Sequence, residues 1–108
     1  MSDTFSDRKK GFEAKFKQDQ EFNFKVEARR NKLLGLWLAG KFETTESERD
    51  AYAKEVVIAD MDEPGVDGVI RKVMGDIAAH KATISEDEVR AKISEFDSVA
   101  RQQLTEES

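Results

Sequence analysis

Apolar side chains recur at helical spacing through most of this sequence, and a single proline, Pro64, interrupts it. The clearest run takes steps of three and four residues: Val66, Val69, Ile70, Val73 and Ile77. Such steps place side chains on one face of an α-helix. No alternating run is long enough to predict a β-sheet. Of the 108 residues 38% are hydrophobic, enough for one small core. We therefore predict an all-α four-helix bundle.

Two apolar stripes in the first 42 residues predict two helical segments. On a helical wheel the first stripe spans about 40°, the second about 60°, and their centres lie about 70° apart. The first stripe consists of Phe5, Phe12 and Phe16, and the second of Phe22, Val26, Leu33 and Trp37.

Between the stripes lies a polar run, residues 17–21, and Gly11 weakens the first segment by about 1 kcal/mol relative to Ala. The pattern predicts a marginal, basic, helical amino-terminal arm over residues 1–20. A helical bundle then follows over residues 21–108, and its first helix is expected from about Glu21 to about Gly40.

Two cap patterns predict where later helices begin. Ser47 followed by Asp50 is a loose capping-box variant, and Ser85 with Glu88 is a full capping box flanked by apolar residues. Pro64 ends the intervening helix. The residues predicted to form the bundle core are Leu33, Trp37, Val56, Val73, Ile77, Val89, Ile93 and Phe96.

The residue types present exclude most catalytic and metal chemistry. There is no Cys and one His, His80, which is expected to be exposed or to cap a helix end. The acidic run 60–63 lacks calcium-loop spacing and is interpreted as a solvated turn between helices. Gly65 and Gly68 do not form a phosphate-binding loop. We predict no catalytic residues, no metal site and no enzymatic activity.

Charge is distributed unevenly along the chain. The net charge of -5 argues against general binding to nucleic acid or to a membrane surface. Residues 1–32, however, hold nine Lys or Arg and six Asp or Glu. A basic helix with a Phe stripe can dock in a partner's groove. The alternatives are a core-packing helix with a charged outer face and a helix lying on a membrane, which the acidic residues of the arm disfavour.

One eleven-residue block, Glu27-Ala28-Arg29-Arg30-Asn31-Lys32-Leu33-Leu34-Gly35-Leu36-Trp37, closely resembles the hallmark of a known family. That family is the zeta subunit of the bacterial F-type ATP synthase. Further similarity covers the segments 5–9, 12–16, 51–53, 56–57, 60–65, 71–73 and 90–92, in order along nearly the whole chain.

The resemblance implies a regulatory subunit that inhibits ATP hydrolysis. Its amino-terminal helix would enter an interface between catalytic and non-catalytic subunits of the ATP synthase head. Carried over by position, the residues expected to bind there are Phe5, Arg8, Lys9, Phe12, Lys15 and Phe16.

The sequence shows no signal peptide and no apolar run long enough to cross a bilayer, which predicts a cytoplasmic protein. The resemblance implies that it is held at the inner membrane through the ATP synthase, and we expect a monomer when it is free. It requires no cofactor, and adenine nucleotide is an alternative ligand. The alternative functions are a ligand-binding bundle and an assembly adaptor with little inhibition.

Overall fold

A computed structural model describes the backbone of residues 2–107 and the side chains of residues 18–107. It contains four helices: α1 (Ser2–Lys41), α2 (Glu46–Asp62), α3 (Val66–Ala79) and α4 (Glu86–Glu107). No strand occurs within this described part. The all-α, four-helix prediction is confirmed.

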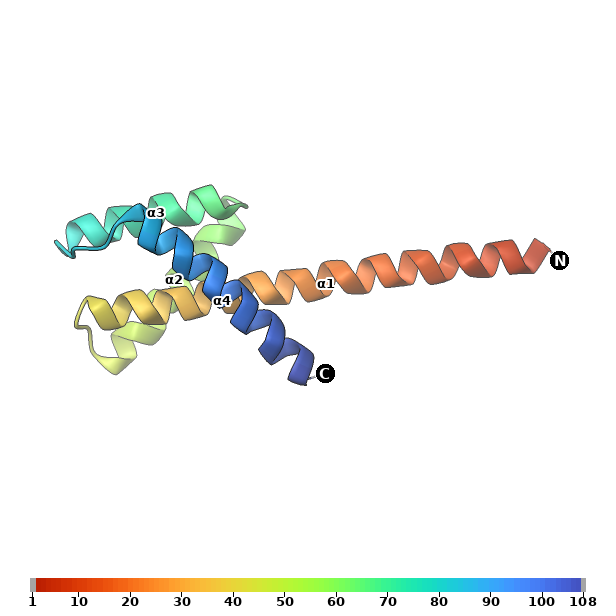
Figure 1. Cartoon of the computed structure of the whole chain (residues 1–108), viewed down its shortest axis with the longest axis horizontal. Coiled ribbons are helices and arrows are strands. Elements are labelled where there is room, and N and C mark those ends of the chain that lie inside the picture. The colour runs from red at the N-terminus through yellow and green to blue at the C-terminus, as the bar shows by residue number, and fades with distance from the viewer. Residues whose placement is uncertain (1, 108) are drawn as a thin grey trace.

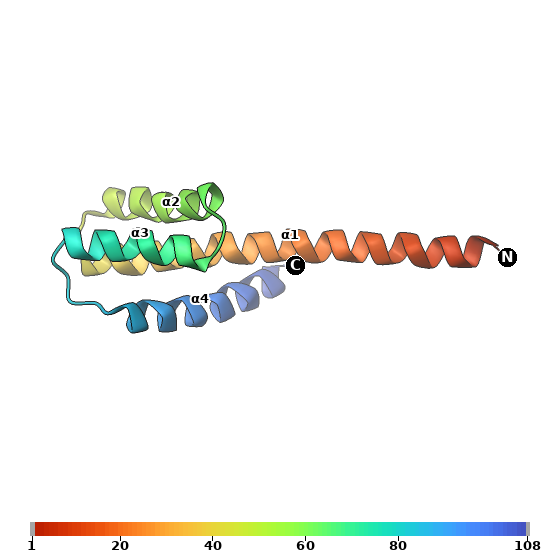
Figure 2. The ribbon, with the colours of Figure 1, turned by 90° about the horizontal axis from the view of Figure 1, so that it is seen from above.

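The second half of α1 is the central element of the bundle. It packs against α2 and α4, and α3 closes the bundle by packing against the same two helices. The first half of α1 continues far beyond the other three helices (Figures 1 and 2). The molecule measures 67 × 25 × 21 Å with a radius of gyration of 17.8 Å, against about 13 Å for a compact domain of this length. The fold is therefore a small bundle with a projecting helix.

The predicted division of α1 into two helices is wrong. Residues Ser2–Lys41 form one helix of 40 residues, without a break in the polar run where one was expected. That run consists of Lys, Gln, Asp and Glu, most of which are good helix formers. Its described side chains, residues 18–21, are exposed. A solvated stretch of helix needs no core anchor, so the absence of apolar residues did not predict a break.

The buried face of α1 also differs from the predicted stripe. The side chains that pack inward recur at every fourth position and are Val26, Arg30, Leu34 and Leu38. Residues four apart form an inclined ridge on a helix, the row commonly used in helix packing. Leu33, Trp37 and Phe22 are only half-buried. The observed face is rotated by about 70° from the predicted one on the wheel. The offset of about 70° between the two predicted stripes was used to separate the arm from the bundle. Because the observed buried face is not the predicted second stripe, that offset does not hold.

The other core predictions are largely confirmed. The buried members are Val56 on α2, Val73 and Ile77 on α3, and Val89 and Ile93 on α4. Phe96 and Trp37 are partly buried and pack against this cluster. The Lys92 ammonium lies 5.4 Å from the Trp37 ring and 5.8 Å from the Phe96 ring. It therefore forms cation–π interactions with both rings at the edge of the core.

One of the two predicted caps is displaced. Thr45, rather than Ser47, caps α2: its Oγ1 accepts from the Glu48 N–H at 3.3 Å, and the Glu48 carboxylate accepts from the Thr45 N–H at 3.2 Å. This is a full capping box, which the loose pattern at Ser47 is not. At α4, Ser85 Oγ accepts from the Glu88 N–H at 3.2 Å, in accordance with the prediction.

A polar contact fastens α2 to α3. The Tyr52 hydroxyl donates to Asp76 Oδ2 at 2.8 Å, and Lys72 Nζ donates to the same oxygen at 2.9 Å. Burial raises the pKa of Tyr52, and the neighbouring Asp76 carboxylate raises it further. The phenol therefore stays protonated and keeps its donor over the whole physiological pH range.

Leu33 and Leu34 provide a matched test of the corrected core. Leu34 is fully buried, whereas its neighbour Leu33 is half-buried. We expect Leu34→Ala to lower the free energy of unfolding by about 2–5 kcal/mol through lost burial and a cavity. Leu33→Ala should cost clearly less. Urea unfolding of both variants measures this, and equal losses would contradict the assignment of the buried face.

Gly35 lies where α1 and α2 come closest. A Cβ at this position would lie 2.6 Å from Ala53 Cα, which is backbone and cannot move aside easily. We expect Gly35→Ala to destabilise the bundle, because the two helices must separate to admit the methyl group. Gly75→Ala is the control, since nothing lies within 4 Å of a Cβ there. It should stabilise α3 by about 0.5–1 kcal/mol. Thermal unfolding of both variants reports the opposite signs.

Candidate functional site

The residues predicted to bind a partner lie on the projecting half of α1. Their side chains fall outside the described residues, so their contacts stay predictions; they are Phe5, Arg8, Lys9, Phe12, Lys15 and Phe16. Among the described side chains of α1, Asn23 is the first whose contact with the bundle is a hydrogen bond, accepted from Arg101 of α4 at 3.3 Å. Val26 is the first that is fully buried.

Arg30 joins α1 to two other helices from inside the bundle. It is 7% exposed, and its guanidinium lies 3.7 Å from the Asp60 carboxylate of α2 and 3.6 Å from the Asp97 carboxylate of α4. The adjacent Asn31 is 1% exposed; it accepts from Arg30 Nε at 3.2 Å and donates to Asp60 Oδ2 at 2.8 Å. The other Asp60 oxygen accepts from the Gly65 N–H at 3.1 Å. Every charge in this network has a partner, as burial requires.

Arg29 makes a more exposed contact with the end of α4. Its guanidinium forms an ion pair with Glu107 and donates to Gln103 Oε1 at 3.3 Å. The hydrogen bond from Arg29 lowers the pKa of Glu107. Together Arg29 and Arg30 hold α4 alongside α1 at the level where α1 leaves the bundle. The two adjacent arginines of the hallmark block therefore set the direction of the projecting segment relative to α4.

The polar network is the structural feature of this region that the sequence reasoning missed. Only apolar residues were placed on the wheel of α1, so Arg30 was not assigned to its buried face. The available signal was its position, four residues after Val26 and four before Leu34. The interpretation of residues 60–63 as a solvated turn is wrong for Asp60, which lies within α2 with a mostly buried, paired side chain. Glu63 is exposed and binds Arg71 at 2.7 Å.

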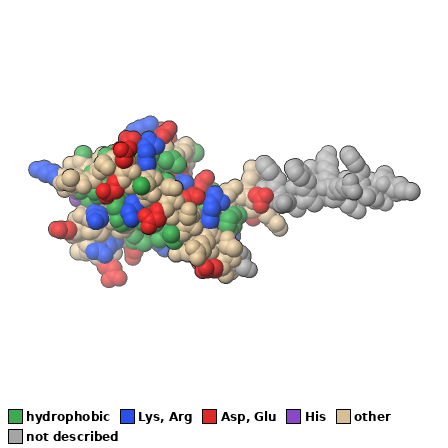
Figure 3. All heavy atoms as spheres, viewed as in Figure 1, with side chains coloured by type: hydrophobic (Ala, Val, Ile, Leu, Met, Phe, Trp, Pro, Cys, Tyr) green, Lys and Arg blue, Asp and Glu red, His purple; other side chains and the backbone are tan. Residues whose placement is uncertain are grey.

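The remaining polar candidates have structural contacts. His80 is exposed at the C-cap of α3, and its ring stacks on Phe42 with centroids 4.1 Å apart. Among the described residues, no three His, Cys, Asp or Glu are placed to hold a metal ion. Within the same residues, no helix combines the length and apolar content needed to cross a bilayer. Figure 3 shows acidic and basic side chains interspersed over one face of the bundle.

Arg30 and Arg29 form a matched pair for testing the network. We expect Arg30→Met to lower the free energy of unfolding by about 3 kcal/mol, because it leaves the nearly buried Asp60 carboxylate without its cation. Arg29→Met should cost clearly less, since both partners of its ion pair are partly exposed. Urea unfolding measures both losses. A loss for Arg29→Met as large as that for Arg30→Met would contradict a special role for the buried guanidinium.

Comparisons with known proteins identify the family. The family model described as ATPase inhibitor subunit zeta matches residues 1–103. A chain whose structure was determined by solution NMR is similar, with 48% identity and a TM-score of 0.69 over 79% of this chain and 96% of that chain. No curated protein was found to match. The match extends over both the projecting half of α1 and the bundle, and the chain therefore belongs to the ATPase inhibitor subunit zeta family.

Proposed function

We propose that this protein inhibits ATP hydrolysis by the ATP synthase by inserting the first half of α1 at an interface between a catalytic and a non-catalytic subunit. The observation that carries the proposal is the geometry of α1. It is one helix of 40 residues whose first half extends away from the bundle, about 30 Å at the rise of an α-helix. A rod of this length can reach into an intersubunit cleft while the bundle stays outside.

Each residue type in the arm has a physical task in such a cleft. Phe5, Phe12 and Phe16 supply apolar area that water leaves on binding, about 1.5–3 kcal/mol for each fully buried ring. Arg8, Lys9 and Lys15 pair with acidic groups and fix the register of the helix. The chain contributes no reacting group in this proposal. Inhibition is steric and conformational, and the protein acts as a regulatory subunit.

The arm would stop hydrolysis by selecting one rotary state of the head. A ligand shifts a conformational equilibrium only as far as its affinities for the states differ. A helix that fits the cleft in a single state stabilises that state and blocks the next rotation. We assign the arm to residues 1–20 and the bundle to residues 21–108. The free protein is proposed to be a cytoplasmic monomer that reaches the inner membrane only through the ATP synthase.

Deleting residues 1–18 tests the arm directly. The deletion should abolish inhibition of ATP hydrolysis by the purified cognate head, because it removes every proposed anchor. The bundle should remain folded, since all the fully buried side chains of the described part lie at Val26 or later. Far-ultraviolet circular dichroism and a cooperative melting curve check the fold. A truncated chain that inhibits as well as the full chain would show that the bundle surface is the inhibitor.

The double variant Phe12→Ala/Phe16→Ala keeps the chain at full length. Losing both rings should weaken inhibition by at least about a hundredfold, which corresponds to about 2.7 kcal/mol. A second comparison concerns the basic residues. Arg8→Glu/Lys15→Glu reverses two charges in the arm, and Arg49→Glu/Lys81→Glu makes the same change on the bundle as its control. Neither Arg49 nor Lys81 forms an ion pair with the described residues. Binding of the full chain without any slowing of hydrolysis would favour an assembly contact instead.

A further inference from the structure

The three large apolar side chains that are most exposed among the described residues gather around one groove. They are Phe24 on α1, 58% exposed, with Ile58 at 54% and Met61 at 61% on α2. Phe24 and Met61 line the same hollow together with Val57, and Val57 continues into an adjoining hollow of about 470 Å³ that Ile58 lines. A third hollow adjoins these two, since Phe24 and Val57 line it as well. We call the three hollows together the α1–α2 groove. Apolar side chains gathered in this way on a small protein mark an interaction surface.

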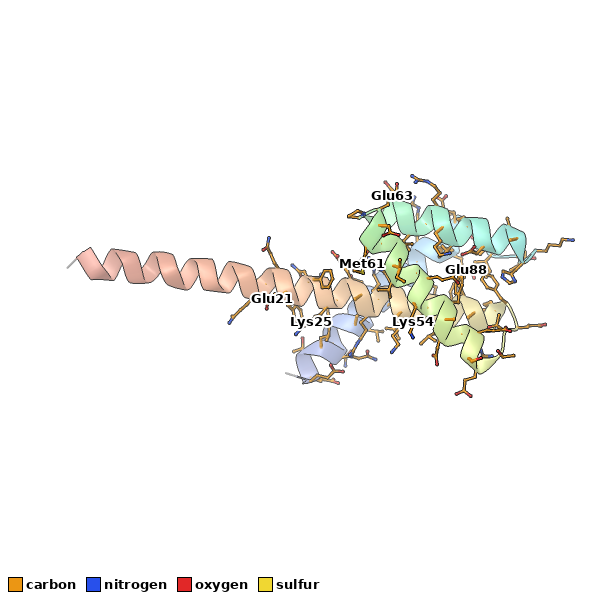
Figure 4. The ribbon with its side chains drawn as sticks, turned by 180° about the vertical axis from the view of Figure 1, so that it is seen from behind. Glu21, Lys25, Lys54, Met61, Glu63 and Glu88 are labelled. Atoms are coloured by element: carbon orange, nitrogen blue, oxygen red, sulfur yellow. The ribbon has the colours of Figure 1, made fainter. Side chains whose placement is uncertain are left out.

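The rim of the α1–α2 groove carries unpaired positive charge. Lys25, Lys32 and Lys54 line it, and none forms an ion pair with the described residues. Figure 4 looks onto this side of the molecule, with Lys25 on α1 and Lys54 and Met61 on α2. Four carboxylates also line parts of the groove, and two of them, Asp60 and Glu107, form ion pairs with Arg30 and Arg29. The three lysines without an ion pair therefore face only Asp50 and Glu27, which leaves an excess of positive charge that complements an acidic partner.

We propose that the α1–α2 groove binds an acidic, amphipathic segment of the ATP synthase head, as a second contact beside the inhibitory arm. This inference rests on the proposed function for its partner. A second copy of the chain fits less well, because two-fold pairing would bring together two copies of the same lysine-bearing rim, whose positive charges repel. The chain's own arm also fits less well, since it is basic and belongs to a helix that leads away from the groove.

The groove and the arm are parts of one rigid element. Phe24 stands eight residues after Phe16 on the same helix, a separation of about 12 Å along its axis. Both contacts can therefore be made to one face of the head at the same time. Once the arm is seated, binding at the groove is intramolecular and raises the overall affinity without altering the arm. The groove would determine how tightly the head binds the inhibitor, and the arm would determine whether rotation stops.

Two double variants of the full chain test the groove, and one matched control accompanies them. Ile58→Gln/Met61→Gln removes the apolar centre, and Lys25→Glu/Lys54→Glu reverses the rim. The control Arg49→Glu/Lys81→Glu makes the same change of net charge at residues outside the groove lining. All of these side chains are exposed, so the fold should persist in each variant. Binding to the purified head and inhibition of its ATP hydrolysis are measured.

We expect both groove variants to raise the dissociation constant by at least about tenfold, with full inhibition retained at saturation. The rim variant should also bind with a weaker dependence on salt. The control should change the dissociation constant by less than about threefold. Groove variants that bind like the control would overturn the proposal. Sedimentation showing a dimer that the groove variants dissociate would overturn it in favour of a second copy.

The arm and groove proposals can fail separately. If Phe12→Ala/Phe16→Ala inhibits normally while the groove variants lose affinity, the arm mechanism is wrong and the groove remains a contact with the head. If the arm variant loses inhibition and the groove variants match the control, the arm mechanism stands and the groove proposal is overturned.

Discussion

The buried guanidinium of Arg30 is the interaction on which the arrangement of the helices depends. It lies within 4 Å of carboxylates from α2 and α4, and Asn31 completes the contact with Asp60. A buried charge is costly to leave without a partner. Sliding α1 by one residue would separate the guanidinium from both carboxylates, so the register of α1 against two helices is tied to this one group. The direction in which the projecting half of α1 leaves the bundle follows from that register.

Close apolar packing completes what the polar network begins. Gly35 admits the backbone of α2 at Ala53, and the Leu34 and Leu38 side chains are then fully buried among the other helices. All of these anchors lie in the second half of α1. One helix therefore has two parts: its second half is held on two sides, and its first half extends beyond the bundle. In the proposed function, the held half would serve as the base that positions the inhibitory segment.

Much of the fold followed from local patterns in the sequence. The helix Val66–Ala79 and the capped start of α4 were predicted because their signals involve neighbouring residues only. The buried face of α1 was misplaced because Trp37 is large and apolar whereas Arg30 is charged. Which of them lies inside depends on carboxylates 30 and 67 positions further along the chain. Likewise, the polar run at residues 17–21 broke no helix, because solvated helix formers need no partner.

The sequence by itself determined the all-helical content, the bounds of three of the four helices to within a few residues, and the absence of Cys chemistry. The block around Arg29-Arg30-Asn31 also indicated the zeta family. These features depend on local propensity and residue order. Only the tertiary structure decided that Arg30 is buried between two aspartates, that Gly35 meets Ala53, and that Phe24, Ile58 and Met61 share one groove. Each of these depends on how helices distant in sequence cross one another, which no local pattern specifies.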